Sequence, residues 1–211
     1  MYIPQGNQMQ DRAEILEFVR RFSFATLITV LDQKPIATHL PFLVEERTDE
    51  LVLISHLALE NEQWKTFAEQ TCLVIFSEPH AYISPSLYNK ELNVPTWNYL
   101  AVHMYGQAHI IPEASQVMNL LNQTVHHYEE AYVAQWNRLP EEYKTRLAKG
   151  IVAFEIKVTD IQAKKKISQN KTTAEQNRIA DYLSKSENSS EKLIGAYMDT
   201  ELKKNSNHSI K

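Results

Sequence analysis

The stretch Val94-Pro-Thr-Trp-Asn-Tyr-Leu-Ala-Val-His-Met-Tyr-Gly106 decides the fold. Its residues alternate like those of a β-strand, and Pro95 marks where the strand starts. One face carries Trp97, Tyr99, Ala101, His103 and Tyr105, and the other carries Asn98, Leu100, Val102 and Met104. A strand with apolar residues on one side and polar aromatic rings on the other fits a sheet between a core and a partner subunit or flat ligand.

Shorter β-type runs surround this strand and predict a mainly β protein with added helices, an α+β fold. Strands are expected at 24–30, 35–44, 51–56, 72–77, 80–84, 96–110 and 151–158, with a turn at 31–34. Helices are expected at 11–22, 61–69, 114–128, 141–148, 173–185 and 190–203. Closely spaced antiparallel strands suggest a barrel or a sandwich, and the short helix at 61–69, expected to turn Trp64, Phe67 and Ala68 inward, is typical of a split β-barrel.

Composition limits the possible partners and compartments. The chain has 211 residues, is 43% hydrophobic and carries a net charge of −4, which gives no general attraction to nucleic acid. The single Cys72 excludes an internal disulfide and a cysteine-based zinc site, and we expect it to be a buried strand residue. Without a signal-peptide pattern or a long apolar run, the sequence predicts a cytoplasmic protein with no membrane association.

The familiar catalytic patterns are missing from the sequence. Four glycines form neither a P-loop nor a dinucleotide fingerprint, so no catalytic residue is predicted. Eight histidines invite a metal site, but the adjacent His126 and His127 lack the spacing of a helical ligand pair, and structural histidines are the preferred interpretation. Ser84 and Ser86 are expected to cap a turn rather than to act as nucleophiles.

The basic segment Lys164-Lys-Lys-Ile-Ser-Gln-Asn-Lys171 allows two interpretations. It belongs to residues 144–171, which hold eight of the 22 Lys and Arg residues. The usual interpretation of such a run is a solvated basic loop. The alternative is an anion site, because Lys166 offers a cation and Ser168, Gln169 and Asn170 offer neutral hydrogen-bonding groups that suit a phosphate or a flavin edge.

Several ordered motifs together resemble the PaiB family of FMN-binding negative transcriptional regulators. They extend from residue 1 to about residue 185. The motifs are Met1-Tyr-Ile-Pro4, Thr38-His39-Leu-Pro41, His56-Leu-Ala58 followed by Asn61 and Gln63-Trp64-Lys65, His80-Ala-Tyr-Ile-Ser-Pro85, Pro95-Thr-Trp-Asn-Tyr99 and Lys166-Ile-Ser-Gln-Asn170.

The resemblance implies a flavin-reductase-like split β-barrel that binds FMN in a groove of a homodimer. It also implies a part in repressing sporulation and degradative-enzyme genes, through a flavin signal, DNA or a regulatory protein partner. The FMN-binding domain is expected at 1–172, followed by a C-terminal helical extension at 173–204 and a polar tail at 205–211. The cofactor-binding candidates carried over by position are Thr26, Thr38, His39, His56, Asn61, Trp97, Asn98, Lys166 and Gln169.

One departure from the family pattern concerns the phosphate of FMN. Relatives usually have an arginine where this chain has Leu59, and the acidic Glu60 follows it. Losing one charge-assisted hydrogen bond to phosphate removes about 1.5–3 kcal/mol, or roughly ten- to a hundredfold in affinity. The sequence therefore predicts weakened FMN binding unless Lys65 or Lys166 compensates.

A flavin-dependent oxidoreductase is the alternative function, because a bound flavin would supply the hydride chemistry and no acid–base pair need be visible. A third possibility, suggested by Leu59, is a degenerate pocket, which would leave a structural or interaction protein. NAD(P)H consumption with added FMN distinguishes an enzyme from a binding module.

Overall fold

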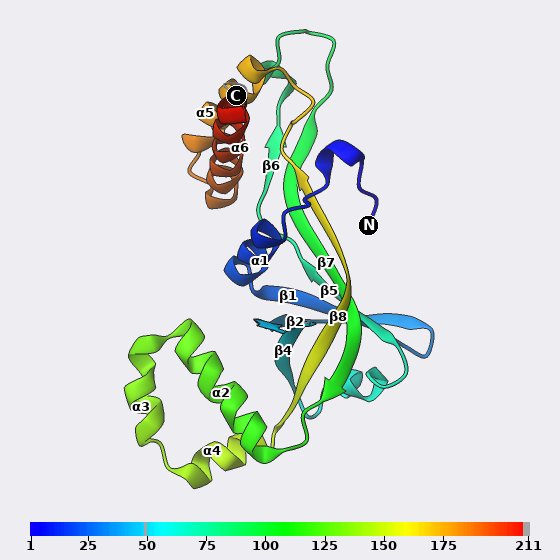
Figure 1. The fold of residues 1–211 in the computed structure, drawn as a ribbon, viewed down its shortest axis with the longest axis vertical. Coiled ribbons are helices and arrows are strands. Elements are labelled where there is room, and N and C mark those ends of the chain that lie inside the picture. The colour runs from blue at the N-terminus through cyan, green and yellow to red at the C-terminus, as the bar shows by residue number, and fades with distance from the viewer. Residues whose placement is uncertain (49, 209–211) are drawn as a thin grey trace. The chain divides into compact units, whose positions relative to one another are not determined.

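A computed structural model describes residues 1–48 and 50–208, with the side chains of 207 and 208 left out (Figure 1). The chain divides into two compact units, each assembled from separate segments. Unit 1 consists of residues 1–15, 77–102 and 162–211, and unit 2 consists of residues 16–76 and 103–161. No helix among the described residues is both long and apolar enough to cross a membrane.

Antiparallel strands form the framework of unit 2. Their bounds are β1 Phe24–Leu31, β2 Lys34–Pro41, β3 Leu43–Arg47, β4 Glu50–Ala58 and β5 Thr71–Phe76, together with the parts of β7 (Thr96–Ile110) and β8 (Ile151–Lys166) that fall in this unit. The strand order is β2-β1-β5-β7-β8-β4-β3. Asp32 and Gln33 connect β1 to β2 with positive φ angles of 51° and 61°, the conformation that a tight hairpin requires.

A cluster of phenylalanine rings fills the core of unit 2. Phe42, Phe67, Phe76 and Phe154 are at most 1% exposed, and Phe67 and Phe154 are 4.8 Å apart between ring centroids. Gly106 lets β7 approach β8 closely, because a Cβ atom there would lie 2.1 Å from the carbonyl oxygen of Lys157. The strands that carry the candidate residues are therefore fixed to a dense core.

Helices accompany the strands of unit 2. They are the larger part of α1 (Arg12–Arg21), the 3₁₀ helix η2 (Glu62–Thr66), α2 (Ala114–Tyr128), the 3₁₀ turn η4 (Glu130–Tyr132), α3 (Val133–Arg138) and α4 (Glu141–Ala148). Figure 1 shows α2, α3 and α4 as one excursion between β7 and β8. The fully extended strand 96–110 and the helices 114–128 and 141–148 are confirmed as predicted.

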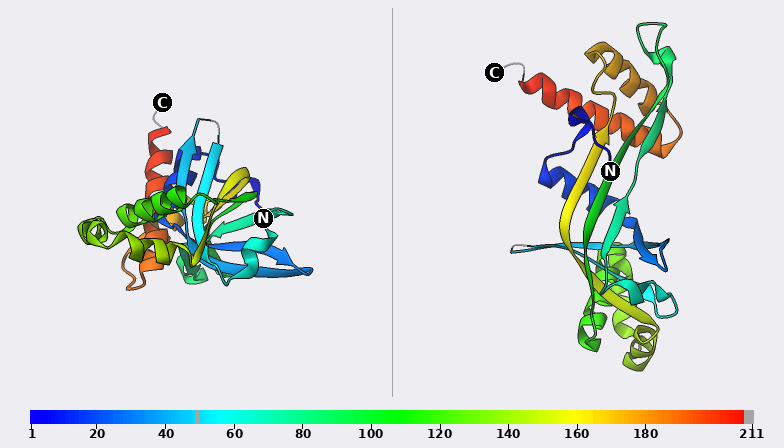
Figure 2. Two further views of the ribbon diagram at one scale, coloured as in Figure 1. Left: turned by 90° about the horizontal axis from the view of Figure 1, so that it is seen from below. Right: turned by 90° about the vertical axis from the view of Figure 1, so that its right-hand side faces the viewer.

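Unit 1 combines a β-ribbon with a helical pair. It contains η1 (Gln5–Asn7), β6 (His80–Ile83) paired with β7, η3 (Pro85–Leu87), α5 (Thr173–Ser184) and α6 (Ser189–His208). Both views of Figure 2 and Figure 1 place α5 and α6 side by side. Gly195 permits this close packing, since a Cβ atom there would lie 3.2 Å from the carbonyl oxygen of Ala180.

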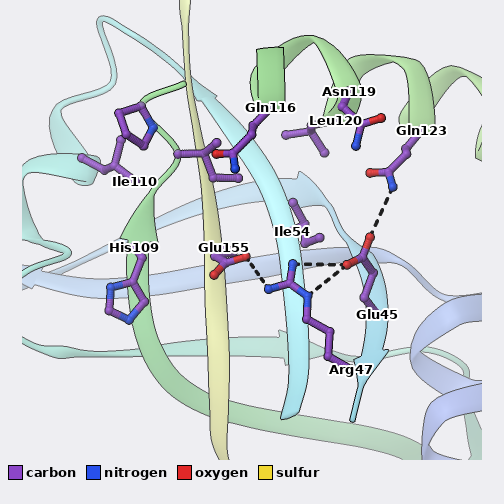
Figure 3. A pocket seen from close by; sticks show the side chains of 12 residues that line it. Glu45, Arg47, Ile54, His109, Ile110, Gln116, Asn119, Leu120, Gln123 and Glu155 are labelled. Carbon is purple, nitrogen blue, oxygen red and sulfur yellow. Dashed lines mark hydrogen bonds and ion pairs between the residues drawn. The ribbon is translucent and has the colours of Figure 1, made fainter. Parts of the chain in front are cut away.

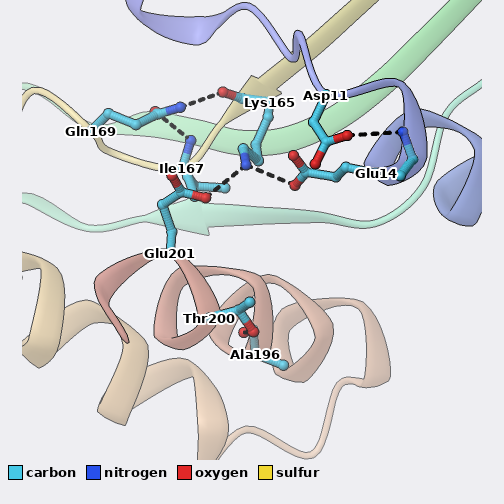
Figure 4. A network of polar contacts seen from close by, with 9 residues as sticks. Asp11, Glu14, Lys165, Ile167, Gln169, Ala196, Thr200 and Glu201 are labelled. Atoms are coloured by element: carbon cyan, nitrogen blue, oxygen red, sulfur yellow. Dashed lines mark hydrogen bonds and ion pairs between the residues drawn. The ribbon is translucent and has the colours of Figure 1, made fainter. Parts of the chain in front are cut away.

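A buried ion-pair network joins three segments of unit 1 that are far apart in the sequence (Figure 4). The Lys165 ammonium lies 2.7 Å from Glu14 Oε1 and 2.7 Å from Glu201 Oε2, and its side chain is 10% exposed. Burial lowers the pKa of Lys165, but the two carboxylates outweigh it and leave the pKa above its ordinary value. The network joins α1, β8 and α6.

Several expectations from the sequence need correction. The strand expected at 35–44 is two strands, because Phe42 leaves the ladder, buries its ring and donates its N–H to Ser23 O at 2.9 Å. The strand expected at 151–158 extends to Lys166, and Lys164 and Lys165 are buried rather than part of a solvated loop. Helix α3 was not predicted.

Other expectations differ in detail or have no test here. The helix expected at 61–69 is the shorter η2. Phe67 is buried as predicted, but Ala68 is exposed. Gln63 is buried instead, and its side-chain amide donates to Leu27 O at 3.3 Å. Ser84 caps η3 by accepting from Ser86 N, as predicted. The domain division at residues 172 and 204 stays a prediction.

Candidate functional site

A partly exposed surface of the β1–β2 hairpin holds two of the predicted site residues. Thr26 and His39 are paired in register, and Thr26 Oγ1 lies 3.0 Å from His39 Nδ1. The His39 ring stacks on Phe24 with 6.4 Å between ring centroids and 27° between planes, and Phe24 is 67% exposed. We call Phe24, Thr26 and His39 the hairpin face.

A hydrogen-bonded network on the opposite side of the same hairpin holds two more. Asn61 Nδ2 donates to Thr38 Oγ1 at 2.9 Å, and Thr38 Oγ1 donates to Gln63 Oε1 at 2.6 Å. Asn61 Oδ1 also accepts from the Gln63 backbone N–H at 3.1 Å, which caps η2. Because Thr38 and His39 are consecutive in a strand, their side chains point to opposite faces and do not form one cluster.

His56 is carried by a different strand, β4, where it pairs with Ala153 of β8. Its side chain is half-buried, and burial lowers its pKa from the ordinary value. Burial therefore disfavours the charged form of the ring in the folded protein.

We expect His56 to make the stability of the protein depend on pH. Because its folded pKa is depressed, its stabilising contribution is complete above the unfolded pKa of about 6.5 and is lost as the pH falls through the folded pKa. The check is the free energy of unfolding from about pH 7.5 to about pH 5. The natural chain should lose stability more steeply than His56→Gln, and identical slopes would contradict the expectation.

The four remaining candidates lie in unit 1, and two of them are engaged internally. Asn98 is fully buried and exchanges hydrogen bonds with the Ser168 hydroxyl at 3.0 and 3.1 Å. Gln169 closes its own loop, donating to Lys165 O and accepting from Ile167 N at 2.8 Å. Their side chains hold the polypeptide rather than present free groups.

Trp97 and Lys166 are the more accessible pair. Trp97 is 52% exposed, and its ring lies 5.8 Å from that of Tyr82 and 5.9 Å from that of His80. The Lys166 ammonium donates to Thr96 Oγ1 and to Trp97 O, the latter at 2.7 Å. Burial lowers the pKa of Lys166. The structure thus separates the predicted residues into three sets in unit 2 and one in unit 1.

Leu59 stands at an open position in unit 2. Its side chain is 48% exposed, its N–H donates to Gly150 O at 2.9 Å, and its carbonyl accepts from Trp64 Nε1 at 3.1 Å. The nearby Lys65 is paired with Glu62. Lys65, one of the two cations named as a replacement for an arginine at position 59, therefore already has an acidic partner on the surface.

A polar cavity of about 530 Å³ lies elsewhere in unit 2 (Figure 3). Arg47 dominates it, 2.9 Å from Glu155 and 3.2 Å from Glu45. Burial opposes the charge of Arg47, but Glu155 and Glu45 raise its pKa above the ordinary value. Because two carboxylates surround one guanidinium, this cavity does not favour an anion.

Other reactive residue types are accounted for by structure. Cys72 is fully buried, and burial raises the pKa of its thiol to about 11, so it is inert as predicted. Among the side chains that the structure describes, those of residues 1–48 and 50–206, no three His, Cys, Asp or Glu residues gather as metal ligands. Two residues were not identified from the sequence: Phe24, the exposed ring beside His39, and Gln63, the buried amide that binds Thr38. Neither residue type distinguishes these roles in a sequence.

Comparison with known proteins agrees with this architecture. The flavocytochrome Anf3 from Azotobacter vinelandii has a TM-score of 0.59 at 15% identity, covering 75% of this chain and 68% of that protein. The FAD and heme binding protein from Mycobacterium smegmatis also has a TM-score of 0.59 at 15% identity, covering 76% and 73%. At this identity the likeness concerns the fold alone, which is the split β-barrel class known from flavin-binding proteins.

The sequence matches identify the family. Residues 1–160 match the family described as "Putative FMN-binding domain". The Bacillus subtilis (strain 168) protein "Protease synthase and sporulation protein PAI 2" is 40% identical over 208 residues, covering 97% of this chain and 99% of the relative. The chain therefore belongs to the PaiB family.

Proposed function

We propose that this chain is a PaiB-like negative transcriptional regulator that binds FMN. The observation that carries the proposal is the family match over residues 1–160, which contains the hairpin face. The resemblance to a protease synthase and sporulation protein over nearly the whole chain favours control of sporulation and degradative-enzyme genes. We further propose a cytoplasmic homodimer, because flavin sites in this fold need two chains.

The side chains of the hairpin face fit the ring system of a flavin better than its phosphate. Phe24 and His39 offer two exposed aromatic rings, and the Thr26 hydroxyl offers a hydrogen-bonding group beside them. In unit 2, Leu59 replaces a cation and Lys65 is held by Glu62. We therefore propose that the binding energy comes from the ring, with weak help from the phosphate. The flavin, when bound, would supply redox chemistry or a redox signal.

Binding through the ring predicts that FMN and riboflavin bind with nearly equal affinity, within about threefold, because less than about 0.7 kcal/mol separates them. Quenching of flavin fluorescence by cofactor-stripped protein measures both dissociation constants. A matched variant, His39→Ala, should weaken the binding of FMN and of riboflavin by the same factor. FMN binding more than about tenfold tighter than riboflavin would show that a cation outside our proposal holds the phosphate.

A flavin-dependent oxidoreductase remains the second candidate, supported by the exposure of the hairpin face, where a hydride donor could approach a bound ring. Catalytic oxidation of NADH or NADPH by the FMN-loaded chain, above the rate of free FMN, would favour the enzyme. For the regulator, a mobility-shift assay across a salt series tests for DNA, since true phosphate contacts weaken steeply with salt. DNA-independent capture of a defined regulatory protein would instead indicate a protein partner.

A further inference from the structure

A second cavity, in unit 1, has a different electrostatic character from the Arg47 cavity. It measures about 420 Å³ and is enclosed by the N-terminal segment, the loop before β7 and the loop after β8. Its lining contains two lysines, Lys166 and Lys171, and no Asp or Glu residue. In a chain with a net charge of −4, this concentration of positive charge favours an anionic occupant.

The two lysines have only neutral hydrogen-bond partners among the described residues. Lys166 contacts Thr96 Oγ1 and Trp97 O, and Lys171 donates to Asn93 Oδ1 at 2.9 Å. Each ammonium carries three donors, so Lys171 keeps donors for a further acceptor. The nearby Glu175 uses its carboxylate to accept hydrogen bonds from Asn89 N at 2.9 Å and from the backbone and hydroxyl of Thr172, and it interacts with Lys171 through charge without a hydrogen bond between them.

An unsatisfied hydroxyl gives independent evidence for a ligand. Tyr88 lines the cavity, is 7% exposed, and its buried hydroxyl has no hydrogen-bond partner among the described residues. The Lys171 ammonium lies 3.7 Å from the centroid of its ring. Buried polar groups in native proteins nearly always have a partner, so this hydroxyl is a donor that a ligand in the cavity would satisfy.

We propose that this cavity binds a small organic anion whose phosphoryl or carboxylate group is held by Lys166 and Lys171 and hydrogen-bonded by Tyr88. Pro4, Val94 and Pro95 supply apolar lining for the organic part. The volume falls within the range of small-molecule sites. We propose this anion as a ligand separate from the flavin, because we place the flavin on the hairpin face of unit 2 and every residue that lines this cavity belongs to unit 1.

Calorimetric titration of the full, flavin-free chain tests the proposal with four probes: inorganic phosphate, phenyl phosphate, benzoate and the neutral control phenol. We expect one phenyl phosphate or benzoate per chain and at least tenfold weaker binding of phenol. Tighter binding of phenyl phosphate than of benzoate would show that the site prefers a phosphoryl group. Tighter binding of benzoate would show that it prefers a carboxylate. No anion binding more tightly than phenol would overturn the proposal.

Variants assign the binding to this cavity. Lys171→Met should weaken binding of the anion by roughly ten- to a hundredfold. Tyr88→Phe, which keeps the ring but removes the hydroxyl, should weaken it by roughly two- to tenfold. Lys185→Met removes the same charge at an exposed position of unit 1 and should leave the affinity unchanged. If thermal unfolding shows that Lys171→Met is not folded, Lys166→Met takes its place.

Repetition at saturating FMN separates the two proposals of ligand binding. We expect the affinity for the anion to stay within about twofold, since the sites are distinct. Displacement of the anion by FMN, or equal affinities in Lys171→Met and Lys185→Met, would overturn the inference. A chain that binds the anion but no flavin would leave it intact while refuting the proposed function.

Discussion

Replacing Lys165 with methionine is expected to lower the free energy of unfolding by about 3–5 kcal/mol, the usual cost of breaking a buried ion pair from one side. The substitution leaves Glu14 and Glu201, whose side chains are 19% and 28% exposed, facing each other without their shared cation. Urea denaturation followed by circular dichroism measures the change. It is the largest stability effect that we predict for this chain.

Two control variants isolate the charge effect. Lys185→Met removes a lysine that is 71% exposed and, among the described residues, forms an ion pair only with Asp181; the substitution should cost no more than about 0.5 kcal/mol. Combining Lys165→Met with Glu14→Gln and Glu201→Gln removes all three charges and should recover much of the loss. Equal costs for Lys165→Met and Lys185→Met would show that the network does not stabilise the fold.

The same network has a defined dependence on pH. Because the pKa of Lys165 is raised in the folded chain, its stabilisation is complete below the unfolded pKa of about 10.4 and is lost only as the pH rises through the folded value. On acidification, the loss of stability that we predict is the one that comes from His56.

Replacing Leu59 with arginine is expected to tighten FMN binding by roughly ten- to a hundredfold, the effect of about 1.5–3 kcal/mol from one charge-assisted hydrogen bond. Leu59 is half-exposed, and its backbone N–H and carbonyl are bonded to Gly150 and to the Trp64 indole. The longer side chain can therefore replace Leu59 without disturbing the core. Flavin fluorescence titration measures the affinity.

Riboflavin is the decisive control for this substitution. Riboflavin lacks the phosphate, so its affinity should be the same for Leu59→Arg as for the natural chain. The neutral substitution Leu59→Gln should change the affinity for neither FMN nor riboflavin. The gain for FMN should shrink as salt rises, because exposed charges are screened. An equal gain for FMN and riboflavin would mean that residue 59 acts on the ring or on the fold rather than on the phosphate.

Local periodicity explains which parts of the fold the sequence could predict. The strand 96–110 and the helix 114–128 repeat their apolar residues at fixed intervals, and this pattern, together with Pro95 before the strand, predicts their bounds. The last part of β8 was missed because Lys164, Lys165 and Lys166 look solvated in sequence. Their burial depends on partners distant in the chain, such as Glu14, 151 residues from Lys165.

The candidate site shows the same division. The family resemblance selected Thr38 and Asn61, which share a hydrogen bond. It could not show that the side-chain amide of Asn98 donates to the Ser168 hydroxyl. Tyr88 drew attention only as one aromatic residue among several. Its unsatisfied hydroxyl is a property of burial, which no single-residue pattern records.

The interleaving of the two units has a consequence for biosynthesis. All of unit 2 has been translated once residue 161 is made, whereas unit 1 still lacks residues 162–211. The segments 1–15 and 77–102, made early, must therefore wait for Lys165, α5 and α6 before their unit is complete. A nascent chain is thus expected to protect unit 2 from protease before it protects unit 1, although unit 1 holds the amino terminus.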